Sequence, residues 1–194
     1  MKILLVAPSD GILGHIGIWM SKALLSAGHK ISYFDYRRQG LFFIQKLREK
    51  AGINTIQKMN KRFFKKVAVS KPDLVLVLFG ENIGAATLQK IKLKTPAVLA
   101  NWFFDTVVSK YRKEFLAVYP AYYDYFFMID IEKALGESPA CRGNYIRLPL
   151  ACDPEVHRKI YLSETEKMKY DNKIVFIGTV TPAREPILEY ISDL

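Results

Sequence analysis

Lys71-Pro72-Asp73-Leu74-Val75-Leu76-Val77-Leu78-Phe79-Gly80 is the stretch of sequence that decides the fold of this chain. Its middle part, from Leu74 to Phe79, is entirely apolar, and turn residues stand on both sides of it. A short apolar run between turn residues is typical of a strand that is buried on both faces, as in a parallel sheet. We therefore expect a core strand at 74–79.

Further strands and helices alternate on both sides of this strand. Short apolar runs predict strands at 3–7, 30–36, 96–101, 125–129 and 145–148. Apolar residues at helical spacing predict helices at 16–27, on each side of Gly52 within 37–71, and at 84–92, 110–121 and 131–135. Strands that alternate with helices indicate βαβ units. The predicted fold class is therefore α/β with a mostly parallel sheet.

The last part of the chain begins a new pattern. Residues 163–172 are charged and poor in large aliphatic side chains, which is typical of an interdomain linker. Residues 173–184 resemble a buried strand, a glycine turn and the start of a helix. One strand and one helix cannot satisfy the backbone groups of a core strand. We therefore expect a first domain at 1–162, a linker at 163–172, and at 173–194 the first strand and helix of a truncated second domain.

Composition excludes several classes of protein. The chain has 194 residues, of which 50% are hydrophobic and 25% charged, with a mean hydropathy of +0.03, as in a soluble globular domain. The apolar start breaks at Pro8, unlike a signal peptide, and no run approaches the roughly 20 apolar residues of a membrane span. Cys141 and Cys152 have neither the number nor the spacing of a disulfide framework or a zinc site. We expect a cytoplasmic protein without a metal.

The positive charge is concentrated in one segment. Residues 37–71 contain eleven basic residues and one acidic residue, which equals the net charge of +10 of the whole chain. Such a segment attracts nucleic acid, anionic lipid headgroups or phosphorylated substrates, and a solvated helix face is the simpler alternative. The predicted basic surface comprises Arg37, Arg38, Lys58, Lys61, Arg62, Lys65 and Lys66.

A glycine-rich loop follows the first predicted strand. Gly11, Gly14 and Gly17 are spaced three apart in a loop expected at 8–14 and at the start of the next helix. They allow a ligand to approach the backbone, and the helix that follows offers free N–H groups to an anion. The spacing differs from the dinucleotide fingerprint. Glycines that only permit a tight strand-to-helix turn are the alternative, which the sequence leaves open.

Several polar and aromatic residues follow predicted strands, where open parallel sheets bind ligands. His15, at the start of the first helix, is a candidate proton acceptor, with a packing or capping role as the alternative. Asp105 is a second candidate base, with an N-cap as the alternative. Glu81 and Trp102 are candidate substrate-binding residues because they lie at the ends of the strands at 74–79 and 96–101.

The order of these segments resembles the GT-B glycosyltransferases, and within them the CgeB-like group named for spore-maturation proteins. Each motif is short, and their order and spacing along nearly the whole chain carry the resemblance. The segments are Lys2-Ile3-Leu4-Leu5-Val6 with the glycine loop, Lys71-Pro72-Asp73-Leu74-Val75-Leu76-Val77, Asn101-Trp102-Phe103-Phe104-Asp105, Tyr123-Asp124-Tyr125-Phe126-Phe127, Leu148-Pro149-Leu150-Ala151-Cys152-Asp153-Pro154 and Lys173-Ile174-Val175-Phe176-Ile177-Gly178-Thr179.

The resemblance implies a Rossmann-like three-layer domain, the N-terminal half of a GT-B architecture, which shapes the acceptor side of an interdomain cleft. The C-terminal domain of that architecture binds most of the nucleotide-sugar donor. Gly178 and Thr179 would begin the donor-phosphate region, with Arg184 close by to meet negative charge. The chain lacks an Asp-x-Asp metal motif, and Thr106 follows Asp105 where members often have a second acidic residue.

Two functions from different classes follow. The first is the acceptor domain of a nucleotide-sugar-dependent glycosyltransferase, inactive alone. Its partners would be a nucleotide sugar and a glycan, phosphorylated or lipid-linked acceptor, with peripheral contact to an anionic membrane. The alternative is a non-catalytic Rossmann-like binding module that holds nucleic acid or an acidic partner on its basic helices, nucleic acid being the less favoured partner.

Overall fold

The computed structural model describes residues 1–37, 55–105, 110–129, 145–169, 175–176, 178, 180–182 and 184–192, with the backbone alone at 12–13 and 110–113. The chain divides into two compact units, Met1–Asp153 and Pro154–Leu194, and each is considered by itself. The first helix expected in the basic segment, with Arg38, and the helix expected at 131–135 lie outside the described residues, as does Thr179.

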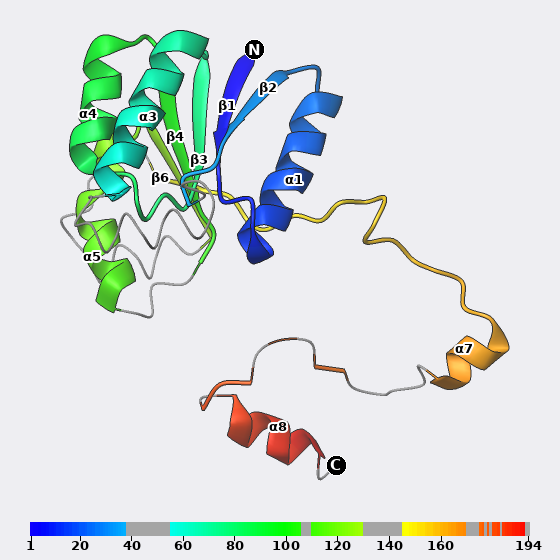
Figure 1. Ribbon diagram of the computed structural model, residues 1–194. Coiled ribbons are helices and arrows are strands. Elements are labelled where there is room, and N and C mark those ends of the chain that lie inside the picture. The colour runs from blue at the N-terminus through cyan, green and yellow to red at the C-terminus, as the bar shows by residue number, and fades with distance from the viewer. Residues whose placement is uncertain are drawn as a thin grey trace. The chain divides into compact units, whose positions relative to one another are not determined.

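A single parallel sheet forms the centre of the first unit (Figure 1). In the described part of the chain its six strands lie in the order β2-β1-β3-β4-β5-β6, and all neighbouring strands are parallel. The prediction of an α/β domain with a mostly parallel sheet is therefore confirmed, and the architecture is Rossmann-like. The strands are β1 (Lys2–Val6), β2 (Lys30–Phe34), β3 (Leu74–Leu78), β4 (Val98–Phe103), β5 (Tyr125–Met128) and β6 (Tyr145–Arg147).

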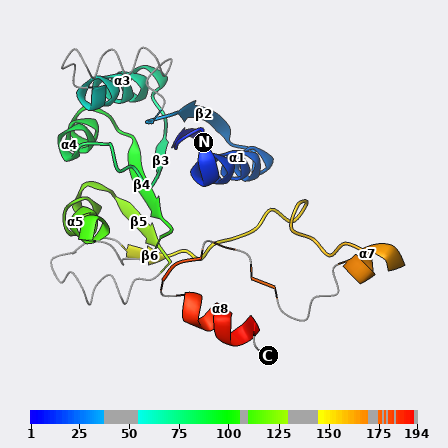
Figure 2. The ribbon, with the colours of Figure 1, turned by 60° about the horizontal axis from the view of Figure 1, so that its bottom comes forward.

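Helices cover the two faces of the sheet unequally, as Figure 2 shows. The helix α1 (Gly11–Ser26) packs on one face, and α3 (Thr55–Ser70), α4 (Ala85–Lys94) and α5 (Lys110–Val118) pack on the other. This division follows from right-handed crossovers, because the step from β1 to β2 runs opposite to the steps from β2 to β3 and onward. A short 3-10 turn, Pro120–Tyr122, leads from α5 into β5.

The decisive apolar stretch is the buried strand β3. From Val75 to Leu78 every side chain is at most 8% exposed. Val75 and Val77 belong to the cluster beneath α3, α4 and α5, whereas Leu76 and Leu78 belong to the cluster on the α1 side. Burial of each such side chain contributes about 1.5–3 kcal/mol at most. An uninterrupted apolar run is therefore what a strand with helices on both sides requires.

The basic helix also packs largely as predicted. Of its expected apolar face, Met59, Phe63 and Val67 are buried, whereas Ile56 in the first turn is 49% exposed.

The described residues of the second unit include two short helices. The expected linker at 163–172 includes α7 (Glu164–Lys169), which begins with a capping box between Ser163 and Glu166. The helix expected after the glycine turn is α8 (Glu185–Ser192). Of the strand expected at 173–177, the described residues Val175 and Phe176 form irregular, exposed backbone. A strand needs a neighbouring strand with which to form backbone hydrogen bonds. The described residues of the second unit include no strand that could pair with Val175 and Phe176.

Across the described ranges, no helix has both the length and the hydropathy needed to cross a bilayer.

Candidate functional site

The strand order places the topological switch point of the sheet between β1 and β3. From β1 the chain continues to β2 on one side, and from β3 it continues to β4 on the other. In open α/β sheets the crevice beyond the carboxyl ends of such a strand pair is the usual ligand site. The loops that follow β1, β2 and β3 therefore define the region in which a site is expected.

The loop after β3 has strained backbone. Phe79 has a φ of 64° and Gly80 a φ of 85°, so two successive residues are left-handed. For a bulky residue such as Phe79 this conformation costs about 1–2 kcal/mol. The Asn101 side chain holds it by donating a hydrogen bond of 2.8 Å to the Phe79 carbonyl oxygen. Strained residues of this kind are typical of functional sites, and here the strained turn presents the next residue, Glu81.

Glu81 is bound by two residues of the loop after β2. The Arg37 Nε–H donates to Glu81 Oε1 at 2.8 Å, and Arg37 Nη2 donates to the same oxygen. The Tyr36 hydroxyl donates to Glu81 Oε2 at 2.6 Å and accepts from the Gly80 N–H at 3.3 Å. Each carboxylate oxygen of Glu81 therefore has a fixed donor, and its side chain is only 18% exposed.

Asp35 connects the loops after β1 and β2 in the same way. Its Oδ2 accepts hydrogen bonds from the Ser9 backbone N–H, at 3.0 Å, and from the Ser9 hydroxyl. Its Oδ1 accepts from the Arg37 N–H at 2.8 Å. Ser9, Asp35, Tyr36, Arg37 and Glu81 thus form one hydrogen-bonded group across three loops, which we name the carboxyl-edge site.

The charges of this site support each other. Burial, together with the nearby charge of Glu81, raises the pKa of Tyr36, so the hydroxyl stays protonated and continues to donate. Burial alone would lower the pKa of Arg37, but the hydrogen bonds and charge of Glu81 outweigh it and the net pKa is raised. A guanidinium has five N–H donors, and Glu81 takes two of those of Arg37, whose side chain is 39% exposed. The site can therefore offer the remaining donors to a phosphate or a sugar hydroxyl.

The two candidate bases belong to other elements of the first unit. His15 is exposed on the second turn of α1, with its ring 6.1 Å from that of Trp19. Asp105 follows β4, and β3 lies between β4 and the strand that leads to α1. The sheet thus brings Glu81 to the switch point, and it places His15 and Asp105 on opposite sides of it.

The glycines of the first loop are used mainly for packing. The expected loop at 8–14 is shorter in the structure because α1 already begins at Gly11, which puts Gly14 and Gly17 inside the helix. A Cβ at Gly14 would lie 2.7 Å from the Ser9 carbonyl carbon, and one at Gly17 would lie 3.0 Å from the Tyr33 hydroxyl. Gly14 therefore allows α1 to pass close to the Ser9 backbone, as a tight strand-to-helix turn requires, and Gly17 allows it to pass close to Tyr33. Gly11 has open space around it.

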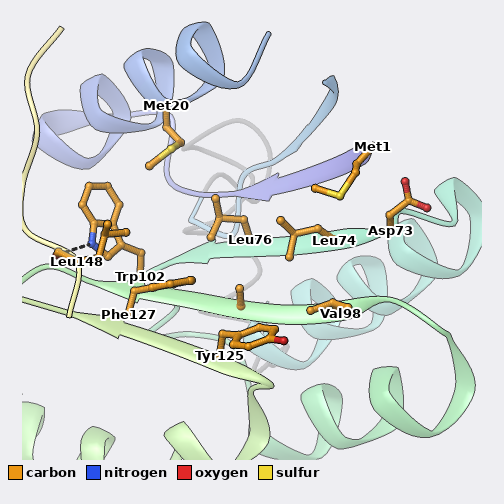
Figure 3. Close-up of a pocket in the computed structure, with 11 residues that line it drawn as sticks. Met1, Met20, Asp73, Leu74, Leu76, Val98, Trp102, Tyr125, Phe127 and Leu148 are labelled. Atoms are coloured by element: carbon orange, nitrogen blue, oxygen red, sulfur yellow. Dashed lines mark hydrogen bonds between the residues drawn. The ribbon is translucent and has the colours of Figure 1, made fainter. Parts of the chain in front are cut away.

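Trp102 faces an apolar groove rather than the switch point. The side chain is 6% exposed, and its Nε1–H lies 3.5 Å from the Leu148 carbonyl oxygen. Figure 3 shows it beside Met20 of α1, on the part of the sheet face that α1 leaves uncovered. The groove has a volume of about 380 Å³. It is lined by Met1, Met20, Asp73, Leu74, Leu76, Val98, Ala100, Trp102, Tyr125, Phe127 and Leu148.

In the second unit, Gly178 and Arg184 lie close together. A Cβ at Gly178 would be 3.5 Å from Arg184 Nη1, and the Arg184 guanidinium carbon lies 6.0 Å from the centre of the Phe176 ring. The backbone of Arg184 donates to the Thr181 carbonyl oxygen at 2.8 Å, immediately before α8.

Sequence reasoning did not select Ser9, Asp35 or Tyr36, and it assigned Arg37 to the basic surface. The available signal was position, since 35–37 follow β2 just as Glu81 follows β3. The other basic candidates in the described residues, Lys58, Lys61, Arg62, Lys65 and Lys66, all lie on α3. Within the described ranges, no group of three or more His, Cys, Asp or Glu side chains could hold a metal ion.

Comparison of the chain with protein-family models and with curated proteins found no match.

Proposed function

We propose that the first unit is the acceptor-side domain of a nucleotide-sugar-dependent glycosyltransferase, and that the carboxyl-edge site binds the acceptor. The observation that carries the proposal is the Arg37–Glu81 pair at the switch point, held by Tyr36 and by a strained turn. A rigid pair of opposite charges with spare donors suits a ligand rich in hydroxyl or phosphate oxygens. The order of sequence motifs supports the same class of enzyme.

In this proposal each residue has a defined role. Arg37 donates to acceptor oxygens, and Glu81 orients the guanidinium. Transfer to a hydroxyl also needs a proton acceptor near the reacting oxygen, and His15 and Asp105 are the candidates. The donor phosphates bind to the domain that begins near residue 173, where Arg184 lies beside Gly178.

Ligand-induced stabilisation tests the proposal. Melting temperatures are measured against a panel of nucleoside diphosphates, nucleotide sugars and phosphorylated glycans, for this chain and for a form extended past Leu194. A ligand at a hundredfold excess over its Kd adds about 2.7 kcal/mol of stability. We expect acceptor glycans to stabilise both forms and one nucleotide class to stabilise the extended form. A flat response of both forms to the whole panel contradicts the proposal.

A matched pair of variants connects any response to the site. Arg37→Gln removes the guanidinium donors and is expected to weaken acceptor stabilisation at least tenfold in Kd, the loss of about 1.4 kcal/mol of charge-assisted hydrogen bonding. Arg158→Gln removes an exposed arginine of the second unit and is expected to leave acceptor binding unchanged. If acceptor ligands stabilise both variants equally, the acceptor does not bind at the carboxyl-edge site, and this part of the proposal is wrong.

A further inference from the structure

The helices α3 and α4 lie side by side on one face of the sheet (Figure 2). Their sequences are rich in lysine and arginine at positions that are not buried. Their inner faces are buried at Met59, Phe63 and Val67 of α3 and at Leu88 and Ile91 of α4. Neither helix contains an acidic residue. The basic residues are Lys58, Lys61, Arg62, Lys65 and Lys66 on α3 and Lys90, Lys92 and Lys94 on α4.

Most of these charges have no counter-charge in the part of the chain that the structure describes. Lys92 pairs with Asp124 at 2.7 Å, and Lys90 lies over the Phe64 ring at 4.3 Å. The five basic residues of α3 have no ion pair within the described ranges. Several of them stand four residues apart, such as Lys61 and Lys65, and like charges at that spacing repel each other. A surface that only confers solubility mixes both signs, so this surface indicates an anionic partner.

Exposed aliphatic side chains accompany the charges. Val69 is 72% exposed and Leu93 is 74% exposed. Both lie in the last turns of their helices, and because both helices run antiparallel to the strands, these turns lie at the same end of the domain. Lysines stand beside them, at Lys65 and Lys66 on α3 and at Lys94 on α4. Aliphatic side chains among lysines are typical of proteins that lie on a membrane surface, whereas nucleic acid binding does not require them.

A groove between α3 and the strand β2 extends this surface. It has a volume of about 510 Å³ and is lined by Tyr33, Phe34, Asp35, Arg62, Lys65, Lys66 and Val69. Three cations face one anion there, and that anion, Asp35, already accepts hydrogen bonds from Ser9 and from the Arg37 N–H. The groove therefore offers a phosphate group cationic donors at one side and an aliphatic side chain, Val69, at another.

We propose that the outer faces of α3 and α4 bind peripherally to an anionic phospholipid bilayer, with a headgroup phosphate in the groove between α3 and β2. Val69 and Leu93 enter the headgroup region, and the basic side chains face the lipid phosphates. This inference is independent of the transferase proposal, because it uses neither the Arg37–Glu81 pair nor the second unit. Asp35 is the one residue of the carboxyl-edge site that also lines this groove.

Vesicle flotation tests the inference with the full chain. The probes are vesicles of phosphatidylcholine alone and of phosphatidylcholine with about one-third phosphatidylglycerol, at low and at physiological salt. We expect binding to the anionic vesicles at least tenfold stronger than to the neutral ones, and weaker binding as salt rises. Equal binding to both vesicle types, or binding to neither at low salt, overturns the inference.

Three double variants assign the binding to this surface. Arg62→Gln with Lys65→Gln is expected to lower the partition coefficient about 25-fold, since each cation near an anionic surface contributes roughly fivefold. Arg158→Gln with Lys159→Gln removes the same charge from the second unit and is expected to leave binding within about threefold of wild type. Val69→Ser with Leu93→Ser keeps the charge and is expected to lower binding about tenfold, since it removes the exposed aliphatic side chains.

The three variants also exclude the alternatives. All six residues are exposed, and circular dichroism and melting curves confirm that each variant is folded. Equal losses in the first two variants would show a general charge effect and overturn the assignment to α3. If the serine variant binds like wild type, and a DNA duplex competes fully with the vesicles at low salt, the surface is a polyanion site and the membrane inference is wrong.

Discussion

Gly14→Ala is the substitution that most directly tests why the first helix contains glycines. Gly14 lies one turn inside α1, where the helix passes the loop after β1. An added Cβ would lie 2.7 Å from the Ser9 carbonyl carbon and 2.9 Å from its oxygen. Ordinary contacts between carbon atoms are about 3.5–4.0 Å long, so Ser9 would have to move by about 1 Å.

Two effects of opposite sign determine the result. Alanine is the better helix former and stabilises a helix interior by about 0.5–1 kcal/mol relative to glycine. The overlap costs about 1–3 kcal/mol, as overpacking usually does. Movement of Ser9 also strains its 3.0 Å hydrogen bond to Asp35, at about 0.5–1.5 kcal/mol. The cost exceeds the gain, and we expect a net loss of about 2 kcal/mol, in the middle of a range of about 0.5–4 kcal/mol, or about 4–8 °C in melting temperature.

Thermal and urea unfolding of Gly14→Ala, followed by circular dichroism, gives the measurement, and Gly84→Ala is the matched control. Gly84 is the N-cap of α4 with an extended backbone, and its added Cβ would find its nearest neighbour, Asn60 Oδ1, at 3.7 Å. The control is expected to cost about 0.5–1 kcal/mol, because glycine is a better N-cap than alanine, and therefore less than Gly14→Ala. A melting temperature of Gly14→Ala equal to or above that of wild type would refute the packing argument and return Gly14 to the candidate ligand-binding residues.

Three further predictions concern tyrosine and aspartate side chains. Tyr36→Phe removes the 2.6 Å hydrogen bond to Glu81 and is expected to lower the free energy of unfolding, measured in urea, by about 1.5–3 kcal/mol. Tyr33→Phe is the control and is expected to cost less, because the partner of Tyr33 is the neutral Pro8 carbonyl oxygen. Similar losses from both variants would contradict the role given to Glu81. Burial raises the folded-state pKa of Tyr36 above the ordinary tyrosine value of 10.0, so the stability that this residue contributes is fully present below pH 10 and is lost as the pH rises further. Burial likewise raises the pKa of Tyr33 to about 12, so both tyrosines make the free energy of unfolding fall with pH above pH 10. Tyr36→Phe removes one of these two titrating groups. It is expected to reduce the fall by about 1.4 kcal/mol per pH unit and to leave the contribution of Tyr33. Burial opposes the ionisation of Asp124, but hydrogen bonds from the Leu99 N–H and from Lys92 outweigh it and lower the pKa of Asp124 below 3.8. The stability that ionised Asp124 contributes is therefore present above that pH and is lost as the pH falls below it. Asp124→Asn is therefore expected to lower stability at pH 7 and to make the variant less sensitive to acid below about pH 4 than wild type in urea titrations.

The fold could be predicted because its elements are local. Each of the six strands was expected within about two residues of its observed bounds. The signal was strongest for the central strands, such as β3 and β4, which are buried and must therefore be short apolar runs. The start of α1 could not be predicted in this way. Its glycines indicate a loop by propensity, and only the contact of Gly14 with Ser9 shows why a helix tolerates them.

The candidate site was less predictable because its contacts join residues far apart in the sequence. Glu81 was selected as a candidate binding residue because it follows the strongest strand, and the structure places it in a loop at the switch point. Its partner Arg37 lies 44 residues earlier, and no local pattern connects the two. Asp35 and Tyr36 show the same limit, because an ordinary strand-end residue gains its role only when the sheet order brings it beside another loop.

The same argument changes how the basic surface should be defined. The sequence groups charges by position and therefore counts Arg37 together with the lysines of α3. The fold groups them by face, so Arg37 is neutralised by Glu81 at the carboxyl edge, while Lys90 and Lys94 of α4 join α3. A test that removes charge by segment would mix these two surfaces. Vesicle binding of Arg37→Gln is therefore expected to stay close to that of wild type, and a loss as large as that of Arg62→Gln with Lys65→Gln would mean that the two surfaces act as one.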